Sequence, residues 1–416
     1  MTITNGDKPN NSRERKILWV SSIILDVHLH KTSLLGILKH LAERGDNITL
    51  IAMRSKNVFT NENSQVRIIS VPLRYVPVVS PVMFAIVIFF LLPVYIINFK
   101  PNFIIARPDV SILSLIPGLL FFKLKKIKLI LDVRTTPVET VQLRGFLRKL
   151  DFVISILVAK KLFDGMTIIT PLMKKEICNR FYVNPDKVGV WTDGVSTTLF
   201  NPRNYISESM ELRRKLGLSG KFVVFYHGAF SDTRGLTETI NAMTILKSKY
   251  PNVVFFLLGT GPILQMLRTV IHKNDLQNNV VIHSPVDHSE VPKFISMSDV
   301  CIVPLPNHPY WRFQCPLKLL EYLAMEKVAI LTDIPAHRLI VGKEKCGIYI
   351  SSIKPIEIAK SILYAYRNKE KLEEWGATGR TIIDEKYSWE KVAKDLESYL
   401  LSIDDKVALG EKFGKK

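Results

Sequence analysis

The sequence predicts an α/β protein built from two doubly wound parallel-sheet halves. Short apolar runs typical of buried strands alternate with helix-length amphipathic segments along most of the chain. The alternation begins near residue 16, is broken by a polar, turn-rich stretch at 201–209, and then starts again. Strands that alternate with helices favour parallel sheets. Because ligands of open α/β sheets lie beyond the carboxyl ends of the strands, two facing halves are expected to form one cleft.

Composition and charge narrow the classes of partner. The chain has 416 residues, of which 47% are hydrophobic and 23% charged, as in globular proteins. Its formal net charge of +19 indicates an anionic partner: nucleic acid, a phosphorylated substrate or an anionic membrane surface. Alternatively, the positive charge serves only to keep the protein soluble and comes from Lys-rich helix surfaces. The four cysteines form no C-x-x-C pair, so we interpret them as free structural thiols in a reducing compartment.

The first predicted half covers residues 16–200 and follows a polar segment, 1–15, that is expected to be a mobile tail. A helix is expected at 31–43, where leucine and isoleucine residues form one apolar face. The predicted strands of this half are residues 16–21, 47–52, 66–71, 102–106, 127–133, 166–170 and 187–191.

The second predicted half covers residues 201–386, and a C-terminal helix with a basic tail covers 387–416. The predicted strands of the second half are residues 222–226, 253–258, 280–282, 300–303, 328–332 and 347–350. The predicted helices are residues 236–249, 262–273, 289–297, 316–325 and 355–367, followed by a final helix at 389–401.

An apolar segment at 75–99 carries no charged residue and is long enough to span a bilayer. Pro81 and Pro93 interrupt it, and predicted strands of one sheet flank it, so a true span would divide that sheet. We interpret it as a hairpin-like or kinked helical element that packs on the first half and partly faces lipid; a fully buried core helix is the alternative. Basic residues at 123–128 and between 144 and 161 fit an interface with anionic lipid, or a solvated basic face.

The stretch 315–331, which reads CPLKLLEYLAMEKVAIL, combines a helix start with a Lys/Glu pair. Pro316 suits the first helical position, where a missing N–H costs nothing. Lys318 and Glu321 lie three residues apart and share one helix face. The free N–H groups and the dipole of a helix start favour an anionic ligand. An ordinary helix with a solvated Lys318–Glu321 pair is the alternative.

Glycine turns follow the first two predicted strands of the second half. In HGAFSDTRGL, residues 227–236, Gly228 permits close backbone approach and Arg234 can point at phosphate near the next helix start. In LGTGP, residues 258–262, Pro262 is expected at the first helical position. The sequence contains neither a GxGxxG fingerprint with a downstream acidic residue nor a GxxxxGK[ST] loop, so it does not support a nicotinamide cofactor. Likewise, its His, Cys, Asp and Glu residues lack metal-ligand spacing, and we predict no metal ion.

These segments stand in a fixed order, which begins with WTDGVSTTLFNP at 191–202 and continues through the two glycine turns. VIHSPVDHSEVPKFISMSDVCIVP at 281–304, the 315–331 stretch and YSWEKV at 387–392 follow. The series resembles the second domain of the family 4 glycosyltransferases of GT-B architecture, over about 181–401, with a weaker likeness over 16–170. The resemblance implies retaining transfer of a sugar from a nucleotide-sugar donor, such as a UDP- or GDP-sugar, without a metal ion or cofactor.

The resemblance also implies a role for each site residue. Arg234 and Lys318 would neutralise the leaving diphosphate, whose oxygen would take the acceptor's proton, and Glu321 would accept from the ribose hydroxyls. The implied donor-binding residues are Gly228, Arg234, Gly259, Gly261, Pro316, Lys318, Leu319 and Glu321. The implied catalytic residues are Lys318, Arg234 and Arg134, and the acceptor-side residues are His28, His30 and Asp132.

Departures from the family pattern leave a second hypothesis open. Phe313 stands where the family often has a glutamate, Ala229 replaces a usual arginine, and Arg134 stands where a histidine often lies. The expected protein is a cytoplasmic transferase, peripheral on the cytoplasmic membrane face, with a lipid-linked or cell-envelope glycan as acceptor. The alternative is a non-catalytic GT-B binding subunit that docks a partner transferase. No aromatic-laced basic platform is present, so we expect no nucleic-acid partner.

Overall fold

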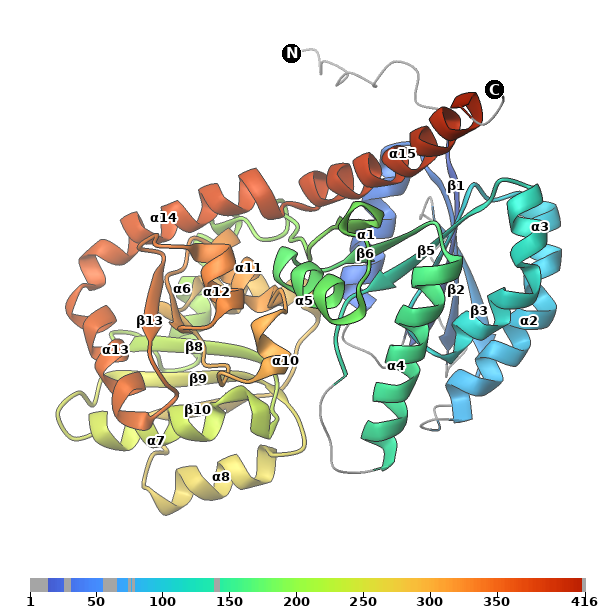
Figure 1. Ribbon diagram of the computed structural model, residues 1–416. Helices are drawn as coiled ribbons and strands as arrows, with labels where there is room; N and C mark the ends of the chain where they lie inside the picture. The colour runs from blue at the N-terminus through green and yellow to red at the C-terminus, as the bar shows by residue number, and fades with distance from the viewer. Residues whose placement is uncertain are drawn as a thin grey trace, which may run out of the picture. The chain divides into compact units, whose positions relative to one another are not determined.

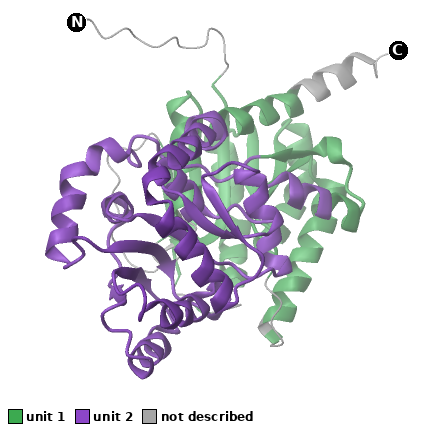
Figure 2. Cartoon of the chain, turned by 90° about the vertical axis from the view of Figure 1, so that its left-hand side faces the viewer, with its two compact units in different colours: residues 1–168, 177–190, 393–416 green, residues 169–176, 191–392 purple. Residues whose placement is uncertain are grey.

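The structure is a computed structural model that describes residues 14–25, 31–54, 66–73, 76, 79–137 and 143–413. Figure 2 shows the chain as two compact units. Unit 1 comprises residues 1–168, 177–190 and 393–416, and unit 2 comprises residues 169–176 and 191–392. Each unit contains a parallel sheet surrounded by helices, which confirms the predicted α/β class (Figure 1).

Unit 1 has a seven-stranded parallel sheet within the described residues, in the order β3-β2-β1-β4-β5-β6-β7. Its inner strands are mostly apolar and buried, as expected where helices cover both faces of a doubly wound sheet. The strands are β1 (Lys16–Ile24), β2 (Asn47–Arg54), β3 (Val66–Pro72), β4 (Phe103–Ala106), β5 (Lys128–Val133), β6 (Gly165–Ile168) and β7 (Val188–Val190). The helical elements are α1 (Lys31–Glu43), α2 (Val79–Phe99), η1 (Val110–Gly118), α3 (Leu119–Leu124), α4 (Leu143–Leu162), α5 (Pro171–Phe181), which continues from unit 2, and η2 (Pro185–Lys187).

The apolar segment forms one 21-residue helix, α2, so the hairpin interpretation is wrong. Pro81 falls in the first turn, where a helix tolerates proline, and Pro93 removes one hydrogen bond without ending the helix. A stripe at every fourth residue packs against unit 1, whereas the opposite face is exposed, so the fully buried alternative is also wrong. The buried stripe consists of Ser80, Phe84, Ile88, Leu92 and Ile96.

Unit 2 has a six-stranded parallel sheet within the described residues, in the order β10-β9-β8-β11-β12-β13. The strands are β8 (Phe222–Ala229), β9 (Val253–Thr260), β10 (Val280–His283), β11 (Val300–Val303), β12 (Ala329–Thr332) and β13 (Gly347–Ile350). The α-helices are α6 (Ile206–Lys215), α7 (Leu236–Leu246), α8 (Leu264–Lys273), α9 (Val291–Ser296), α10 (Pro309–Arg312), α11 (Leu317–Ala324), α12 (Pro335–Val341), α13 (Pro355–Arg367) and α14 (Leu372–Ile382). Shorter helical turns are η3 (Pro202–Tyr205), η4 (Asp232–Arg234), η5 (His288–Glu290), η6 (Lys369–Lys371) and η7 (Ile383–Tyr387).

The polar, turn-rich stretch 201–209 contains η3 and the start of α6. Two local predictions for unit 2 need correction. Pro316 is the N-cap of α11 rather than its first residue, with an extended backbone at φ −74° and ψ 106°. Pro262 lies before the cap of α8, which is Ile263. Each proline ends a loop, because its fixed φ suits the approach to a helix as well as the first turn.

The chain leaves unit 1 after Val190, before the predicted boundary at residue 200. The reason is a backbone bridge that ties the next segment to the C-terminal part of unit 2. The N–H of Val195 donates to the carbonyl of Tyr387 at 2.9 Å, and the N–H of Trp389 donates to the carbonyl of Val195 at 3.3 Å. Trp191 and Phe200 are buried on either side of this bridge.

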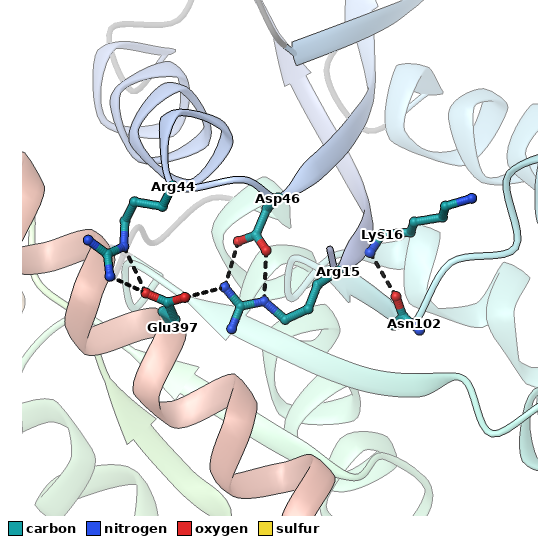
Figure 3. A network of polar contacts seen from close by, with 6 residues as sticks. All are labelled: Arg15, Lys16, Arg44, Asp46, Asn102 and Glu397. Carbon is teal, nitrogen blue, oxygen red and sulfur yellow. Dashed lines mark hydrogen bonds and ion pairs between the residues drawn. The ribbon is translucent and has the colours of Figure 1, made fainter. Parts of the chain in front are cut away.

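The C-terminal helix α15 (Trp389–Phe413) starts in unit 2 and continues into unit 1 from Ala393. In unit 1 it is held by a network of charged side chains (Figure 3). The Glu397 carboxylate accepts from Arg15 Nη2 at 2.8 Å and from Arg44 Nε at 2.7 Å, and Arg15 Nε donates to Asp46 at 2.7 Å. Two carboxylates and two guanidinium groups balance one another, which compensates the burial of these charges.

Candidate functional site

The carboxyl ends of the central strands of unit 2 bring together the loops that sequence reasoning singled out. The paired strands β8 and β9 end side by side, with Gly228 opposite Gly259 in the register. The start of α11 follows β11, the neighbour of β8 on its other side. This arrangement places His227, Gly228 and Lys318 in one cluster.

Lys318 lies at the centre of this cluster and is buried, so the interpretation as a solvated surface residue is wrong. Its ammonium nitrogen lies 3.6 Å from the centre of the Tyr226 ring. A Cβ atom at Gly228 would come within 3.1 Å of the same nitrogen, so the glycine leaves room for the ammonium group. No hydrogen-bond partner for Lys318 Nζ occurs among the described residues.

Arg234 is the second cation of the cluster. Its guanidinium group lies 4.4 Å from the centre of the Trp311 ring, in the range of a cation–π contact. Its Nε atom is buried and, like Lys318 Nζ, has no hydrogen-bond partner among the described residues. The side chain comes from η4, whose end at Gly235 adopts φ 66° before α7 begins.

The two cations make the cluster strongly electropositive. Burial holds the pKa of Lys318 well below its usual range, and the nearby charge of Arg234 lowers it further. A buried cation without an anionic partner is unfavourable because it has lost its hydration. A bound anion would supply that partner, so the cluster is suited to a diphosphate.

Glu321 lies one turn beyond Lys318 on α11, and its carboxylate is held by two histidines. His227 Nε2 lies 2.8 Å from one carboxylate oxygen, and His288 Nε2 lies 2.7 Å from the other. His227 Nδ1 also lies 3.1 Å from the Tyr322 hydroxyl, which suits a neutral imidazole that donates to Glu321 and accepts from Tyr322. The two carboxylate oxygens that the family resemblance assigns to a ribose are thus engaged by imidazoles.

The electrostatics of this triad follow from the hydrogen bonds. Burial alone raises the pKa of Glu321, but the bonds from His227 and His288 outweigh it and hold that pKa well below its usual range. The hydrogen bond to Glu321 raises the pKa of the partly exposed His288. Burial lowers the pKa of His227. The arrangement therefore favours an ionised Glu321 and a neutral His227, and it keeps His288 protonated to a higher pH than an ordinary imidazole.

The glycines of the two turns are required mainly by packing between the strand ends. A Cβ atom at Gly259, which has φ 151°, would lie 2.1 Å from the carbonyl oxygen of Gly228. A Cβ atom at Gly261 would lie 2.1 Å from the carbonyl oxygen of Phe230. Gly259 and Gly261 therefore have a structural role in packing the strand ends. The sequence predicted only a role in donor binding for them.

Leu319 and Phe313 have structural contacts near the same helix start. The Leu319 side chain is fully buried, and its N–H donates to the Pro316 carbonyl at 2.9 Å, so this N–H is already engaged. The earlier N–H groups of α11 have no partner within the helix, as at any helix start. Phe313 caps α10, and its carbonyl accepts from the Thr170 hydroxyl at 2.7 Å.

The predicted acceptor-side residues belong to unit 1. Asp132 is buried within β5 and accepts from the Thr167 hydroxyl on the neighbouring strand β6 at 2.8 Å. Arg134 is also buried and directly follows β5. His28 and His30 lie outside the described residues. Their part in acceptor binding stays a prediction. Within the described ranges, no group of three or more His, Cys, Asp or Glu side chains could hold a metal ion.

Sequence reasoning missed three members of the cluster: His288, Trp311 and Tyr226. Tyr226 lies in β8, and His288 and Trp311 lie in the helical turns that follow β10 and β11, so their place after strand ends is the signal that could have identified them. His227 is paired with Glu321 only in the folded chain. Its pairing with Glu321 spans 94 residues of sequence and depends on the fold.

The two parallel-sheet units have the fold of the GT-B glycosyltransferases. The fold agrees with that of Anabaena HepE in complex with UDP, with a TM-score of 0.73 at 14% identity over 93% of this chain and 100% of that chain. Residues 208–382 match the family described as glycosyl transferases group 1. This matching part of the chain contains the cluster.

Two curated relatives give the same class. An uncharacterized glycosyltransferase of Methanocaldococcus jannaschii is 28% identical over 193 residues, which are 44% of this chain and 46% of the relative. A GDP-mannose-dependent α-(1-6)-phosphatidylinositol monomannoside mannosyltransferase of Mycobacterium tuberculosis is 21% identical over 209 residues, 50% of this chain and 54% of the relative. The chain thus spans about half the length of the curated relatives it matches.

Proposed function

We propose that the protein is a retaining glycosyltransferase that moves a sugar from a nucleotide-sugar donor to an acceptor hydroxyl without a metal ion. The observation that carries this proposal is the pair Lys318 and Arg234, each with a buried nitrogen that lacks a hydrogen-bond partner among the described residues. Lys318 lies at the start of α11 and Arg234 at the end of η4, both in the segment that matches the group 1 glycosyltransferases. A diphosphate would satisfy both nitrogens.

The proposed chemistry needs charge stabilisation more than a strong base. The bond between the anomeric carbon and the diphosphate oxygen breaks, and the acceptor oxygen forms the new glycosidic bond on the same face of the sugar. Lys318 and Arg234 stabilise the negative charge that develops on the leaving diphosphate, which takes the proton of the acceptor hydroxyl. Glu321 exchanges an imidazole for a ribose hydroxyl when the donor binds.

The proposed acceptor is a lipid-linked or cell-envelope glycan, and the proposed location is the cytoplasmic face of the membrane. The apolar, solvent-exposed side of α2 and the net charge of +19 support this choice. The mycobacterial relative, whose name states a phosphatidylinositol-linked substrate, provides further support. Catalytic involvement of Arg134 and acceptor binding by Asp132 are part of the same proposal.

The nucleotide can be found with a thermal-shift screen, since a ligand present at 100 times its Kd stabilises a protein by about 2.7 kcal/mol. The protein is then incubated with the matching nucleotide-sugars and lipid acceptors. The proposal predicts release of the nucleoside diphosphate and a product with the anomeric configuration of the donor. Inverted product would contradict the retaining mechanism, and absence of both binding and turnover would contradict the whole assignment.

A non-catalytic GT-B subunit that docks a partner transferase is the second candidate. The observation that favours it is that both oxygens of Glu321 are engaged by histidines, together with Phe313 at the position of a frequent family glutamate. This candidate predicts nucleotide binding without transfer to any acceptor. Turnover by the isolated chain would exclude it.

A further inference from the structure

Unit 1 presents a broad apolar face on α2 and on the helical pair η1 and α3. α2 packs against η1, and the two lie next to each other in Figure 1. Large apolar side chains along both elements are exposed to solvent by 39–74%. They are Val79, Val82, Met83, Ile86, Phe89, Phe90, Val94 and Ile97 on α2, and Leu113, Leu120, Phe121 and Leu124 on η1 and α3. Contiguous exposed apolar surface of this kind marks an interaction site.

The charges at the C-terminal ends of α2 and α3 have one sign. The sequences of α2, η1 and α3 contain no aspartate or glutamate. The exposed residues Lys100, Lys123, Lys125 and Lys126 lie at or just beyond the C-terminal ends of α2 and α3. These ends lead into β4 and β5, which start side by side with Phe103 opposite Lys128. The lysines therefore gather along one border of the apolar face.

We propose that this face, called the membrane face below, lies in the plane of an anionic lipid leaflet. Its apolar side chains enter the boundary between headgroups and acyl chains, and its lysines contact the lipid phosphates. Interfacial helices with an apolar side and lysines nearby bind anionic bilayers in this way. The face would bring the donor-binding protein to a lipid-linked acceptor, and in this respect the inference rests on the proposed function.

The contacts of α2 argue for in-plane binding rather than a transmembrane span. By length and composition α2 could cross a bilayer, but it is a packed part of unit 1. Phe84 and Ile88 are fully buried against the unit, and Leu92 and Ile96 are at most 4% exposed. A span would strip this stripe from the core. It would also place β3 and β4, two strands of one sheet, at opposite ends of a bilayer.

The occupant is inferred to be a membrane because aliphatic and aromatic side chains are combined here with lysines, and the helices α2, η1 and α3 contain no acidic residue. A second copy of the chain would place lysine borders beside each other or against apolar surface, which gives no charge complementarity. In an anionic leaflet, the acyl chains can contact the apolar side chains of the face, and the phosphates above them can contact the lysines along its border.

Flotation with liposomes tests the inference directly. Full-length protein is mixed with vesicles of phosphatidylcholine alone or with 30% phosphatidylglycerol, about the anionic content needed for a clear charge effect. We expect the wild type to bind the anionic vesicles, and the variants Phe90→Asp and Leu124→Asp to partition at least tenfold more weakly.

The double variant Lys125→Glu/Lys126→Glu should partition at least tenfold more weakly onto anionic vesicles than the wild type, because both attractive charges become repulsive. The matched control Met210→Asp alters a side chain on α6 in unit 2 that is 67% exposed, and it should bind like the wild type.

Three results would overturn the inference. They are failure of the wild type to bind anionic vesicles, equal binding by the membrane-face variants and the control, and resistance of bound protein to alkaline carbonate extraction, which indicates a span. Sedimentation without lipid adds a fourth, since dissociation of a dimer by Phe90→Asp would assign the face to a second copy. All variants replace exposed side chains, and unchanged melting temperatures check that they fold.

The same variants separate this inference from the proposed function. Nucleotide binding in lipid-free solution depends on unit 2, so Phe90→Asp should bind nucleotide like the wild type. Vesicle binding without nucleotide binding would reject the proposed function and keep the membrane face. Nucleotide binding without vesicle binding would reject the membrane face and keep the proposed function.

Discussion

At the residue scale, Lys318 is better explained by a ligand than by the stability of the fold. Its ammonium group is buried beside Arg234, and the contact with Tyr226 and the charge of Glu321 do not offset that burial, since the pKa of Lys318 stays well below its usual range. Replacing a buried charge by an apolar side chain of similar size is often neutral or stabilising. We therefore predict that Lys318→Met leaves the free energy of unfolding unchanged or raises it by about 1–2 kcal/mol. Urea denaturation measures this, and a loss above about 2 kcal/mol would show that Lys318 serves the fold.

The lowered pKa of Lys318 also predicts proton-linked nucleotide binding. A bound diphosphate stabilises the ammonium form, so binding raises the pKa of Lys318 and takes up a proton wherever the free side chain is partly neutral. Affinity should accordingly fall as pH rises through the lowered pKa of the free protein. Calorimetry in two buffers with different ionisation enthalpies measures the uptake above pH 7.5, where the diphosphate itself is ionised. Lys318→Met should show no uptake, and equal uptake by this variant would contradict the assignment.

The histidines of the cluster give a third prediction. The hydrogen bond that His288 donates to Glu321 raises the pKa of His288, so its stabilising contribution is present at low pH and is lost as pH rises through that pKa. Glu321→Gln removes the negative charge and should lower the pKa of His288 to its ordinary range or below, because burial then dominates. Histidine ring signals followed by NMR over pH measure the change. An unchanged His288 titration would mean that Glu321 does not hold this ring.

At the element scale, α15 is fastened to unit 1 through Glu397. Burial raises the pKa of this carboxyl, but the hydrogen bonds from Arg44 and Arg15 outweigh it and lower the pKa overall. We predict that Glu397→Gln lowers the free energy of unfolding by about 2–3 kcal/mol, since Arg44 loses its carboxylate partner and Arg15 loses one of its two. The difference in the free energy of unfolding between Glu397→Gln and the wild type should vanish as pH falls and the Glu397 carboxyl of the native protein is protonated. Glu390→Gln, an exposed change on the same helix, should stay within about 0.5 kcal/mol.

Elements with strong local signals were the ones that the sequence predicted well. The bounds of α1, β11, β13 and α13 agree with the structure, because apolar periodicity and flanking turns mark both of their ends. The prediction of a hairpin at α2 was wrong because neither proline ends the helix. Pro81 lies in the first turn, where a helix tolerates proline, and Pro93 lies inside the helix. Helix starts at Pro262 and Pro316 were wrong by one or two residues, since proline suits both the cap and the first turn.

The site was predictable as far as it depends on the order of motifs along the chain. Lys318, Arg234 and Gly228 do lie together, as that order suggested. The two histidines on Glu321 could not be predicted, because His288 and His227 come from different strand ends and meet only through the sheet order. The burial of Lys318 could not be predicted either, because it depends on the packing of other elements around α11.

At the scale of the whole molecule, the net charge of +19 has a structural counterpart in both units. Unit 2 carries cations buried in a cluster suited to a diphosphate, and unit 1 carries exposed lysines along the border of the membrane face. The two sets differ in their expected response to salt. Exposed charges are screened at a Debye length of about 8 Å in physiological salt, so vesicle binding should weaken steeply with ionic strength while nucleotide binding changes less.

The central claim is that Lys318 and Arg234 bind the diphosphate of a nucleotide donor. Calorimetric titration of the wild type, Lys318→Ala and Arg234→Ala with the nucleoside diphosphate selected by thermal shift tests it most directly. We predict that each substitution weakens binding by about 1.5–3 kcal/mol, the range for a hydrogen bond to a charged group. Unchanged affinity in both variants would remove the pair from the site and contradict the proposed function.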